Sequence, residues 1–347
     1  MSFVHVALNM GYNKGGSMKL AIITITPRAQ KLAEKIVDEL ADDPTVIRVD
    51  IFNKNVKQTL KNIFNSYDCI VGIMATGIMV RNICGLLKHK IKDPAVLVAD
   101  ETGEHVLSLV SGHLGGGNDF AVKIANLIGA DPIITTSTDL NHKLGVDTLA
   151  RRYLLSMDDP SKIKTINTAL INNERVELGV TPDFDFLLEN TEVKESYNGF
   201  ISSSNEIEAS YGNTELFLKP KKLVAGIGAK KGVSGETVIH AVEKAMKILG
   251  LPLRRLNWIA TGEMKKNEPG IIDLSLKLRL PLEIISKDVL KNFKHPDCSK
   301  SDFVMQKFGI FGVCEPSAFI AAGQGSELIF KKTAFHGVTV ALAVSKN

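Results

Sequence analysis

Short apolar segments alternate with helical patterns through the first half of the chain. Residues 69–74 and 95–99 are apolar throughout, and a helical pattern carrying Val80, Ile83 and Leu87 lies between them. Strands that are apolar on both faces are typical of a parallel sheet with helices on both sides. The pattern therefore predicts an α/β fold. It resumes after residue 220, where residues 223–225, 257–260 and 282–285 are the predicted strands.

The chain length and a change in amino-acid composition along it predict three domains. At 347 residues the chain is too long for one small core. Residues 156–219 are rich in Asn, Ser, Glu and Asp, unlike the segments on either side. We expect an N-terminal α/β domain with a glycine-rich loop over 18–155, a middle domain or insert over 156–219, and a C-terminal α/β domain over 220–347. The predicted class is thus α/β, with two parallel-sheet domains flanking a small α+β domain. Residues 1–17 match no element and are expected to be dispensable.

Helix caps and turns give the local boundaries. Thr26 followed by Pro27 predicts a helix start, and Ser234 predicts another. The two apolar runs at 328–334 and 338–345 predict a hairpin at the edge of the C-terminal sheet.

A glycine-rich stretch, residues 111–119, lies between a predicted strand and a predicted helix. Asn118 is placed to cap that helix. The consecutive glycines Gly115, Gly116 and Gly117 let a ligand approach the backbone, and their N–H groups at a helix start suit an anion. Ser111 and His113 add a hydroxyl and an imidazole. The alternative is a flexible connector in which His113 is a structural imidazole.

Polar residues follow several predicted strands, where ligands collect in parallel sheets. Thr76 follows one strand, the pair Asp100 and Glu101 another, and His113 and residues 135–139 two more. The carboxylates are expected to orient His113. The alternative for Asp100 is that its side chain caps a turn.

The loop at 226–232 superficially resembles a dinucleotide-binding fingerprint. Its last glycine falls one residue away from the G-x-G-x-x-G spacing, which argues against NAD binding. Lys230 and Lys231 suit an anion cradle, or are two solvated lysines on a turn. Glu315 precedes Pro316, where a carboxylate is favoured by the helix dipole alone.

Composition limits the class of partner. The net charge of +4 is too small to indicate nucleic acid but suits an acidic small substrate. The four cysteines lack Cys-x-x-Cys spacing, which is typical of a reducing cytosol, and no histidine or cysteine cluster has metal-ligand spacing. No apolar segment reaches the length of a membrane span. We therefore expect a cytoplasmic protein without nucleic-acid, membrane or metal partners.

Taken in order, several motifs resemble the cobalamin biosynthesis protein G family from residue 18 onward. They are residues 75–81, 92–96, 100–103, 111–118, 134–139 and 146–147 in the N-terminal part, and 226–228, 259–261 and 315–318 in the C-terminal part.

The resemblance implies a cobalt-precorrin-5A hydrolase of the anaerobic cobalamin (vitamin B12) pathway. That enzyme opens the ring A lactone and releases acetaldehyde, giving cobalt-precorrin-5B. The macrocycle is the implied partner, and it carries the cobalt, so no separate cofactor is expected. A homodimer and contacts with other pathway enzymes are left open. The alternatives are a non-catalytic tetrapyrrole-binding or channelling protein of the pathway, and a phosphate-binding enzyme unrelated to cobalamin.

For this chemistry we expect His113 to be the general base, with Asp100 or Glu101 as its orienter. The N–H groups of Gly115, Gly116 and Gly117 would stabilise an oxyanion or hold a peripheral carboxylate. The other residues expected to bind substrate are Thr76, Gly77, Arg81, Ser111, Asn118, Thr135, Thr136, Lys230, Lys231 and Glu315.

Overall fold

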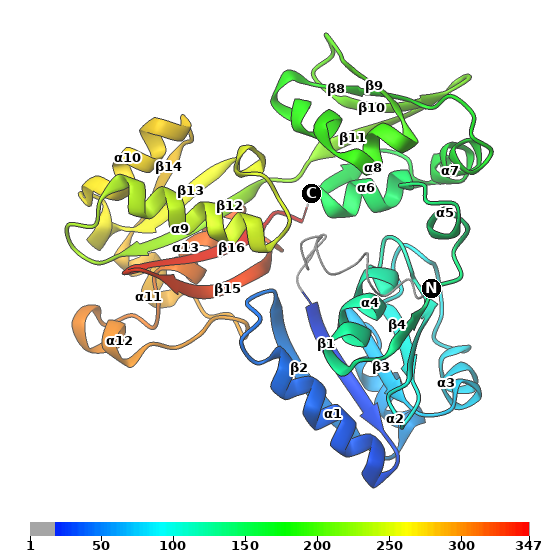
Figure 1. Ribbon diagram of the computed structural model, residues 1–347. Coiled ribbons are helices and arrows are strands. Elements are labelled where there is room, and N and C mark those ends of the chain that lie inside the picture. The colour runs from blue at the N-terminus through cyan, green and yellow to red at the C-terminus, as the bar shows by residue number, and fades with distance from the viewer. Residues whose placement is uncertain (1–17, 347) are drawn as a thin grey trace. The chain divides into compact units, whose positions relative to one another are not determined.

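The computed structural model describes residues 18–346, so the expectation for residues 1–17 lies outside it. The described chain divides into two compact units, residues 18–220 and 221–346. Unit 18–220 contains two sheets and unit 221–346 contains one (Figure 1). Helices pack on all three sheets, and the predicted α/β class is confirmed.

The first sheet has six strands in the order β2-β1-β3-β4-β5-β6. Its strands are β1 Met18–Thr24, β2 Val46–Asn53, β3 Cys69–Ile73, β4 Ala95–Ala99, β5 His105–Val110 and β6 Asp131–Ile133. The first four are parallel, as expected. However, β5 runs antiparallel to β4, and β6 is parallel to β5. The sheet is therefore mixed, because residues 100–104 turn the chain straight back into β5.

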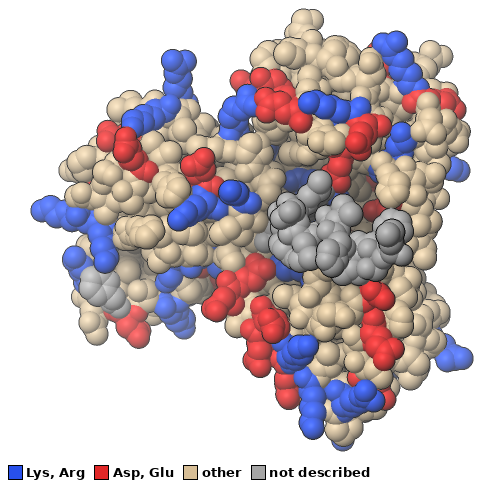
Figure 2. Space-filling model, viewed as in Figure 1, with Lys and Arg blue, Asp and Glu red and all other residues tan. Residues whose placement is uncertain are grey.

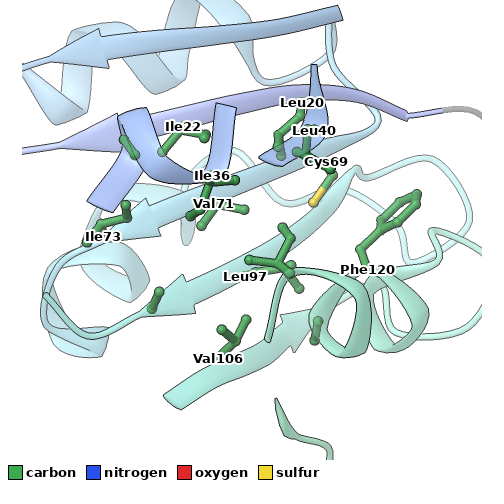
Figure 3. Packing of buried hydrophobic residues seen from close by; sticks show 14 of the residues in the cluster. Leu20, Ile22, Ile36, Leu40, Cys69, Val71, Ile73, Leu97, Val106 and Phe120 are labelled. Carbon is green, nitrogen blue, oxygen red and sulfur yellow. The ribbon is translucent and has the colours of Figure 1, made fainter. Parts of the chain in front are cut away.

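Alternate residues of β1 enter two separate cores. Leu20 and Ile22 pack with helices α1 (Pro27–Leu40) and α4 (Gly117–Ile128), as Figure 3 shows. Ala21 and Ile23 pack with α2 (Val56–Ile63) and α3 (Thr76–Ile83) on the other face. Successive side chains of a strand point to opposite faces, so a wholly apolar strand fills both cores. Each fully buried Leu or Ile contributes roughly 1.5–3 kcal/mol to folding.

The start of α1 follows the prediction. Thr26 is the N-cap, its hydroxyl accepts a hydrogen bond from the Ala29 N–H, and Pro27 is the first helical residue.

The second sheet is built from residues 155–220 in the order β7-β11-β10-β8-β9. Its strands are β7 Leu155–Met157, β8 Glu177–Val180, β9 Asn198–Ile201, β10 Ile207–Tyr211 and β11 Thr214–Pro220. All neighbours pair antiparallel except β8 and β9. The helical segments between residues 137 and 196 are α5 Ser137–Leu140, α6 Val146–Arg152, η3 Pro160–Lys162, α7 Ile163–Ile171, η4 Pro182–Glu189 and α8 Thr191–Ser196.

The third sheet has the order β14-β13-β12-β16-β15. Its strands are β12 Leu223–Ala229, β13 Trp258–Gly262, β14 Leu282–Ile285, β15 Glu327–Phe335 and β16 Val338–Val344. Its helical segments are α9 Gly235–Ile248, η5 Leu253–Arg255, η6 Glu263–Lys265, α10 Pro269–Leu278, α11 Lys287–Asn292, α12 Asp302–Phe308 and α13 Cys314–Ala322. Two predictions are confirmed: Ser234 caps α9, and β15 and β16 form an antiparallel hairpin at the sheet edge.

Acidic and basic side chains are interspersed on the visible face of each unit (Figure 2). Within residues 18–346, none of the helices combines the length and the apolar composition that crossing a bilayer requires.

Helix α13 packs on β12 through a strand glycine. A Cβ built on Gly226 would lie 1.9 Å from the Cys314 carbonyl oxygen and 2.8 Å from the Ala318 nitrogen. Both atoms belong to the helix backbone and cannot rotate away as a side chain would. The absence of a side chain at Gly226 therefore sets how closely α13 approaches the sheet.

We expect Gly226→Ala to lower the free energy of unfolding by about 1–3 kcal/mol, the usual cost of overpacking a core. Fluorescence of Trp258, which lies on the neighbouring strand β13, would follow unfolding of this unit in urea. Gly312→Ala is the control in the same unit, because a Cβ there would meet no atom closer than 3.6 Å. Equal stability of the two variants would contradict the close packing described here.

Candidate functional site

The loop between β5 and α4 and the segment after β6 meet at the carboxyl ends of β5 and β6. They meet because β5 and β6 are parallel neighbours, so their carboxyl ends lie side by side. His113 comes from the loop. Thr136 is the N-cap of α5, and Thr138 and Asp139 lie in that short helix. Asp147, in the first turn of α6, completes the group.

The imidazole of His113 bridges two carboxylates. Its Nε2 lies 3.0 Å from Asp139 Oδ2, and its Nδ1 lies 3.3 Å from Asp147 Oδ2. The Thr138 hydroxyl is 2.8 Å from the same Nε2. The side chain of Asp147 is only 7% exposed, whereas that of Asp139 is 37% exposed. Asp139 is therefore the end of the cluster that solvent or a ligand reaches.

Neutral donors support both carboxylates. Asp139 Oδ2 accepts from the Asn118 amide at 3.0 Å and from the Thr136 hydroxyl at 2.6 Å. Asp147 Oδ1 accepts from the Asn167 amide of α7 at 2.9 Å. Within residues 18–346 no hydrogen bond reaches Asp139 Oδ1. One oxygen of Asp139 is thus saturated and the other is available.

His113 carries a positive charge at neutral pH. Burial acts to lower its pKa, but hydrogen bonds and charge interactions with Asp139 and Asp147 outweigh burial and raise it from 6.5 to about 9. Burial acts to raise the pKa of both carboxyl groups, and the contacts with His113 instead hold both below their usual value. An imidazolium has no lone pair to accept a proton. The expected role of His113 as general base is therefore at odds with its charge state.

The N–H groups of Gly116 and Gly117 bond within the glycine loop itself. The N–H of Gly116 donates to the His113 carbonyl at 2.9 Å, and the N–H of Gly117 donates to the Ser111 carbonyl at 3.0 Å. The expected oxyanion site at these two glycines is therefore wrong. The glycines instead allow a tight turn, since Gly116 has a φ of +78° and a Cβ on Gly115 would lie 2.6 Å from that of Ser111.

Asn118 does not cap α4. The helix begins at Gly117 with Gly116 as N-cap, so Asn118 lies inside the first turn. Its amide donates to Thr136 and Asp139 and joins the loop to the end of β6. Ser111 Oγ is buried without a hydrogen-bond partner among the described residues. Thr135, beside Thr136, is exposed.

Ion pairs join α4 to α6 and fix the distance between His113 and Asp147. Asp119, in the first turn of α4, pairs with Arg151 and Arg152 of α6. Arg152 also reaches Glu192 of α8 at 2.8 Å. The loop that carries His113 and the helix that carries Asp147 are therefore tied together.

Family comparisons cover both parts of the chain. The model described as Cobalamin synthesis G N-terminal matches residues 58–139, and that described as Cobalamin synthesis G C-terminus matches residues 223–343. A Methanocaldococcus jannaschii protein named "Probable cobalt-precorrin-5A hydrolase" is 33% identical over 94% of this chain and 99% of its own length. The chain belongs to the cobalamin biosynthesis protein G family.

Two other relatives agree in extent. A cobalt-precorrin-5A hydrolase from Salmonella typhimurium is 32% identical, covering 85% of this chain and 87% of its own. The crystal structure of a cobalamin biosynthesis protein G homologue from Sulfolobus solfataricus has a TM-score of 0.62 at 24% identity. That alignment covers 96% of this chain and 99% of the homologue, and it shows the same fold.

In this family member the polar residues at strand ends form two groups, not one. Strand β5 runs antiparallel to β4. Thr76, Asp100 and Glu101 therefore lie at the opposite end of the strands from His113. The expected pairing of Asp100 or Glu101 with His113 is therefore wrong. Asp100 instead closes the turn into β5 by accepting from the Thr102, Glu104 and His105 N–H groups, which is the alternative considered above. Glu101 accepts from the Thr26 hydroxyl.

The remaining expected residues are described unit by unit. Thr76, Gly77 and Arg81 are exposed on α3, and Arg81 donates to the Gly77 carbonyl. Lys230 and Lys231 are exposed after β12, in unit 221–346.

Glu315 is 2% exposed and makes structural hydrogen bonds. It accepts from the Ser299 and Lys332 N–H groups and from the Ser299 hydroxyl. These bonds occupy both of its oxygens, so the expectation that Glu315 binds substrate is wrong for this structure.

Within residues 18–346, no group of three or more His, Cys, Asp or Glu side chains is arranged to hold a metal ion. Burial is the main cause that raises the pKa of Cys298 and Cys314 to about 12, so both are thiols at neutral pH.

Sequence reasoning missed Asp139 and Asp147 as partners of His113. Both stood in motifs that resemble the family, at 134–139 and 146–147, and Asp139 ends a run of hydroxyl residues. That run was a usable signal, because hydroxyls at a strand end supply donors for a carboxylate.

The raised pKa of His113 gives a pH window for stability. A folded pKa of about 9 against 6.5 means that the stabilisation is complete below pH 6.5 and is lost as pH rises through about 9. We expect the wild-type free energy of unfolding to fall between pH 6.5 and pH 10 more steeply than that of His113→Gln. Urea denaturation at several pH values would measure this. Parallel pH profiles would show that the cluster does not bind the extra proton.

Proposed function

We propose that the protein is a cobalt-precorrin-5A hydrolase of cobalamin biosynthesis, opening the ring A lactone and releasing acetaldehyde to give cobalt-precorrin-5B. The observation that carries the proposal is the match to a relative of that name over 94% of this chain and 99% of the relative. The His113–Asp139–Asp147 cluster supports it, because it puts a cation and an accessible carboxylate together at a sheet edge.

The reaction consumes one water and has two parts. Water adds to the lactone carbonyl, the acyl carbon–oxygen bond breaks, and a carboxylic acid and an alcohol result. The alcohol then loses its proton as its carbon becomes the carbonyl of acetaldehyde. The electron pair of the broken carbon–carbon bond stays on the macrocycle, which takes up the proton that the alcohol lost. Both parts need a proton acceptor at an oxygen and a positive charge near developing negative charge.

The cluster offers a role for each member. Asp139 accepts a proton from water or from the alcohol through Oδ1, the oxygen that receives no hydrogen bond from residues 18–346. His113 supplies the positive charge and returns a proton to the leaving oxygen. Asp147 is a positioning residue, because it is buried and holds the second ring nitrogen of His113. The cobalt belongs to the substrate, and the proposal assigns no separate cofactor.

We expect Asp139→Asn to slow acetaldehyde release from cobalt-precorrin-5A by roughly 10²–10⁴-fold, the usual contribution of a general base. Acetaldehyde would be trapped by alcohol dehydrogenase and NADH in oxygen-free buffer. Asp131→Asn is the matched control, because Asp131 is exposed at the other end of the same strand β6. A wild-type rate in Asp139→Asn would show that Asp139 is not the general base. Macrocycle binding by the wild type without any acetaldehyde would favour the non-catalytic carrier.

A further inference from the structure

A pocket of about 460 Å³ opens in unit 221–346, which contains none of the residues proposed as catalytic. It lies beside α11 and α13, which Figure 1 labels. Its described lining is Leu290, residues 293–296 and 298–300, Phe311, Gly312 and Pro316. Small-molecule sites have volumes of roughly 300–1,000 Å³. The pocket is therefore large enough for a ring with its substituents.

The walls of the pocket are flat and apolar. Phe293, Pro296 and Pro316 line it, together with Phe311, which is 46% exposed. The ring of His295 is stacked with that of Phe293 at 6.3 Å between centroids and lies 4.2 Å from that of Phe319. Such surfaces favour a planar ligand, because aromatic faces pack best against other flat π systems.

The charged side chains among the described lining residues are both lysines. Lys294 and Lys300 line it and are exposed, and Lys300 Nζ lies 5.4 Å from the centroid of the Phe311 ring. No aspartate or glutamate is among its described lining residues. Glu315 is adjacent in sequence but is turned away, with its oxygens bound to Ser299 and Lys332. Two lysines beside aromatic walls suit a planar ligand that carries carboxylates.

We propose that this pocket binds one edge of the tetrapyrrole substrate, a pyrrole-type ring with its carboxylate arms. This deepens the proposed function and rests on it for the identity of the ligand. Phe311 and Phe293 contact the ring, and Lys294 and Lys300 pair with the arms. Glu315 builds the wall by holding the Ser299 backbone, which gives this carboxylate a structural role.

Two stable corrinoids test the ligand class. Dicyanocobyrinic acid carries carboxylate arms, whereas dicyanocobinamide has amide arms on the same ring. Cyanide occupies both axial positions of the cobalt in each, so the protein cannot ligate the metal. We expect the full-length protein to bind the acid at least tenfold more tightly than the amide in isothermal titration calorimetry. Added salt should weaken binding of the acid, as it does for exposed charge pairs.

Charge reversal locates the binding. Lys294→Glu and Lys300→Glu should each weaken binding of dicyanocobyrinic acid about tenfold, and Phe311→Ala should weaken both ligands. All three side chains are exposed, and unchanged circular dichroism would verify folding. Lys247→Glu is the control, since Lys247 is exposed on α9 and does not line the pocket. In turnover, the pocket variants should raise KM for cobalt-precorrin-5A and leave kcat within about twofold.

The outcomes separate the two proposals. Failure of the wild type to bind dicyanocobyrinic acid, or unchanged affinity in all three pocket variants, would overturn the pocket assignment. Acetaldehyde release with unchanged KM in those variants would overturn it while leaving the hydrolase proposal intact. Binding that depends on Lys294 and Lys300, in a protein that releases no acetaldehyde, would support the pocket and refute the hydrolase.

Discussion

The reversal of chain direction between β4 and β5 decides where the polar residues of the first sheet lie. Asp100 enforces it, because its carboxylate accepts three backbone N–H groups in the turn. Burial acts to raise the pKa of Asp100, but the hydrogen bonds from this turn lower it well below its usual range. The turn is thus held by an ionised side chain at neutral pH. With β5 reversed, β6 follows it in parallel, and the loops after these two strands meet.

Those loops bring the positive charge of His113 together with the negative charges of Asp139 and Asp147. A buried carboxylate such as Asp147 is costly unless it is paired and hydrogen-bonded, and here His113 and Asn167 meet both needs. Because Asn167 belongs to α7, the cluster links the edge of the first sheet to the helices of the second. The ion pairs of Asp119 with Arg151 and Arg152 hold the same two regions together. Removal of the His113 side chain would therefore leave Asp147 buried without its charged partner.

Under the two proposals made above, the two units have different tasks. The cluster in unit 18–220 concentrates opposite charges on a few atoms, which suits proton transfer. The pocket in unit 221–346 spreads two positive charges over an apolar surface, which suits recognition of a large anionic ring.

Local sequence determined a good part of this structure. The wholly apolar strands, the caps at Thr26 and Ser234 and the terminal hairpin followed from propensity and periodicity, which act over a few residues. The family followed from ordered motifs. The direction of β5 did not follow from the local sequence. An apolar strand has the same composition in either orientation, and only pairing with β4 decides its direction. The partners of His113 depended on that choice, since Asp139 is 26 residues away in sequence and Asp147 farther still. Tertiary structure alone brought these three side chains together, because carboxylates and an imidazole attract one another only once the backbone has made them neighbours.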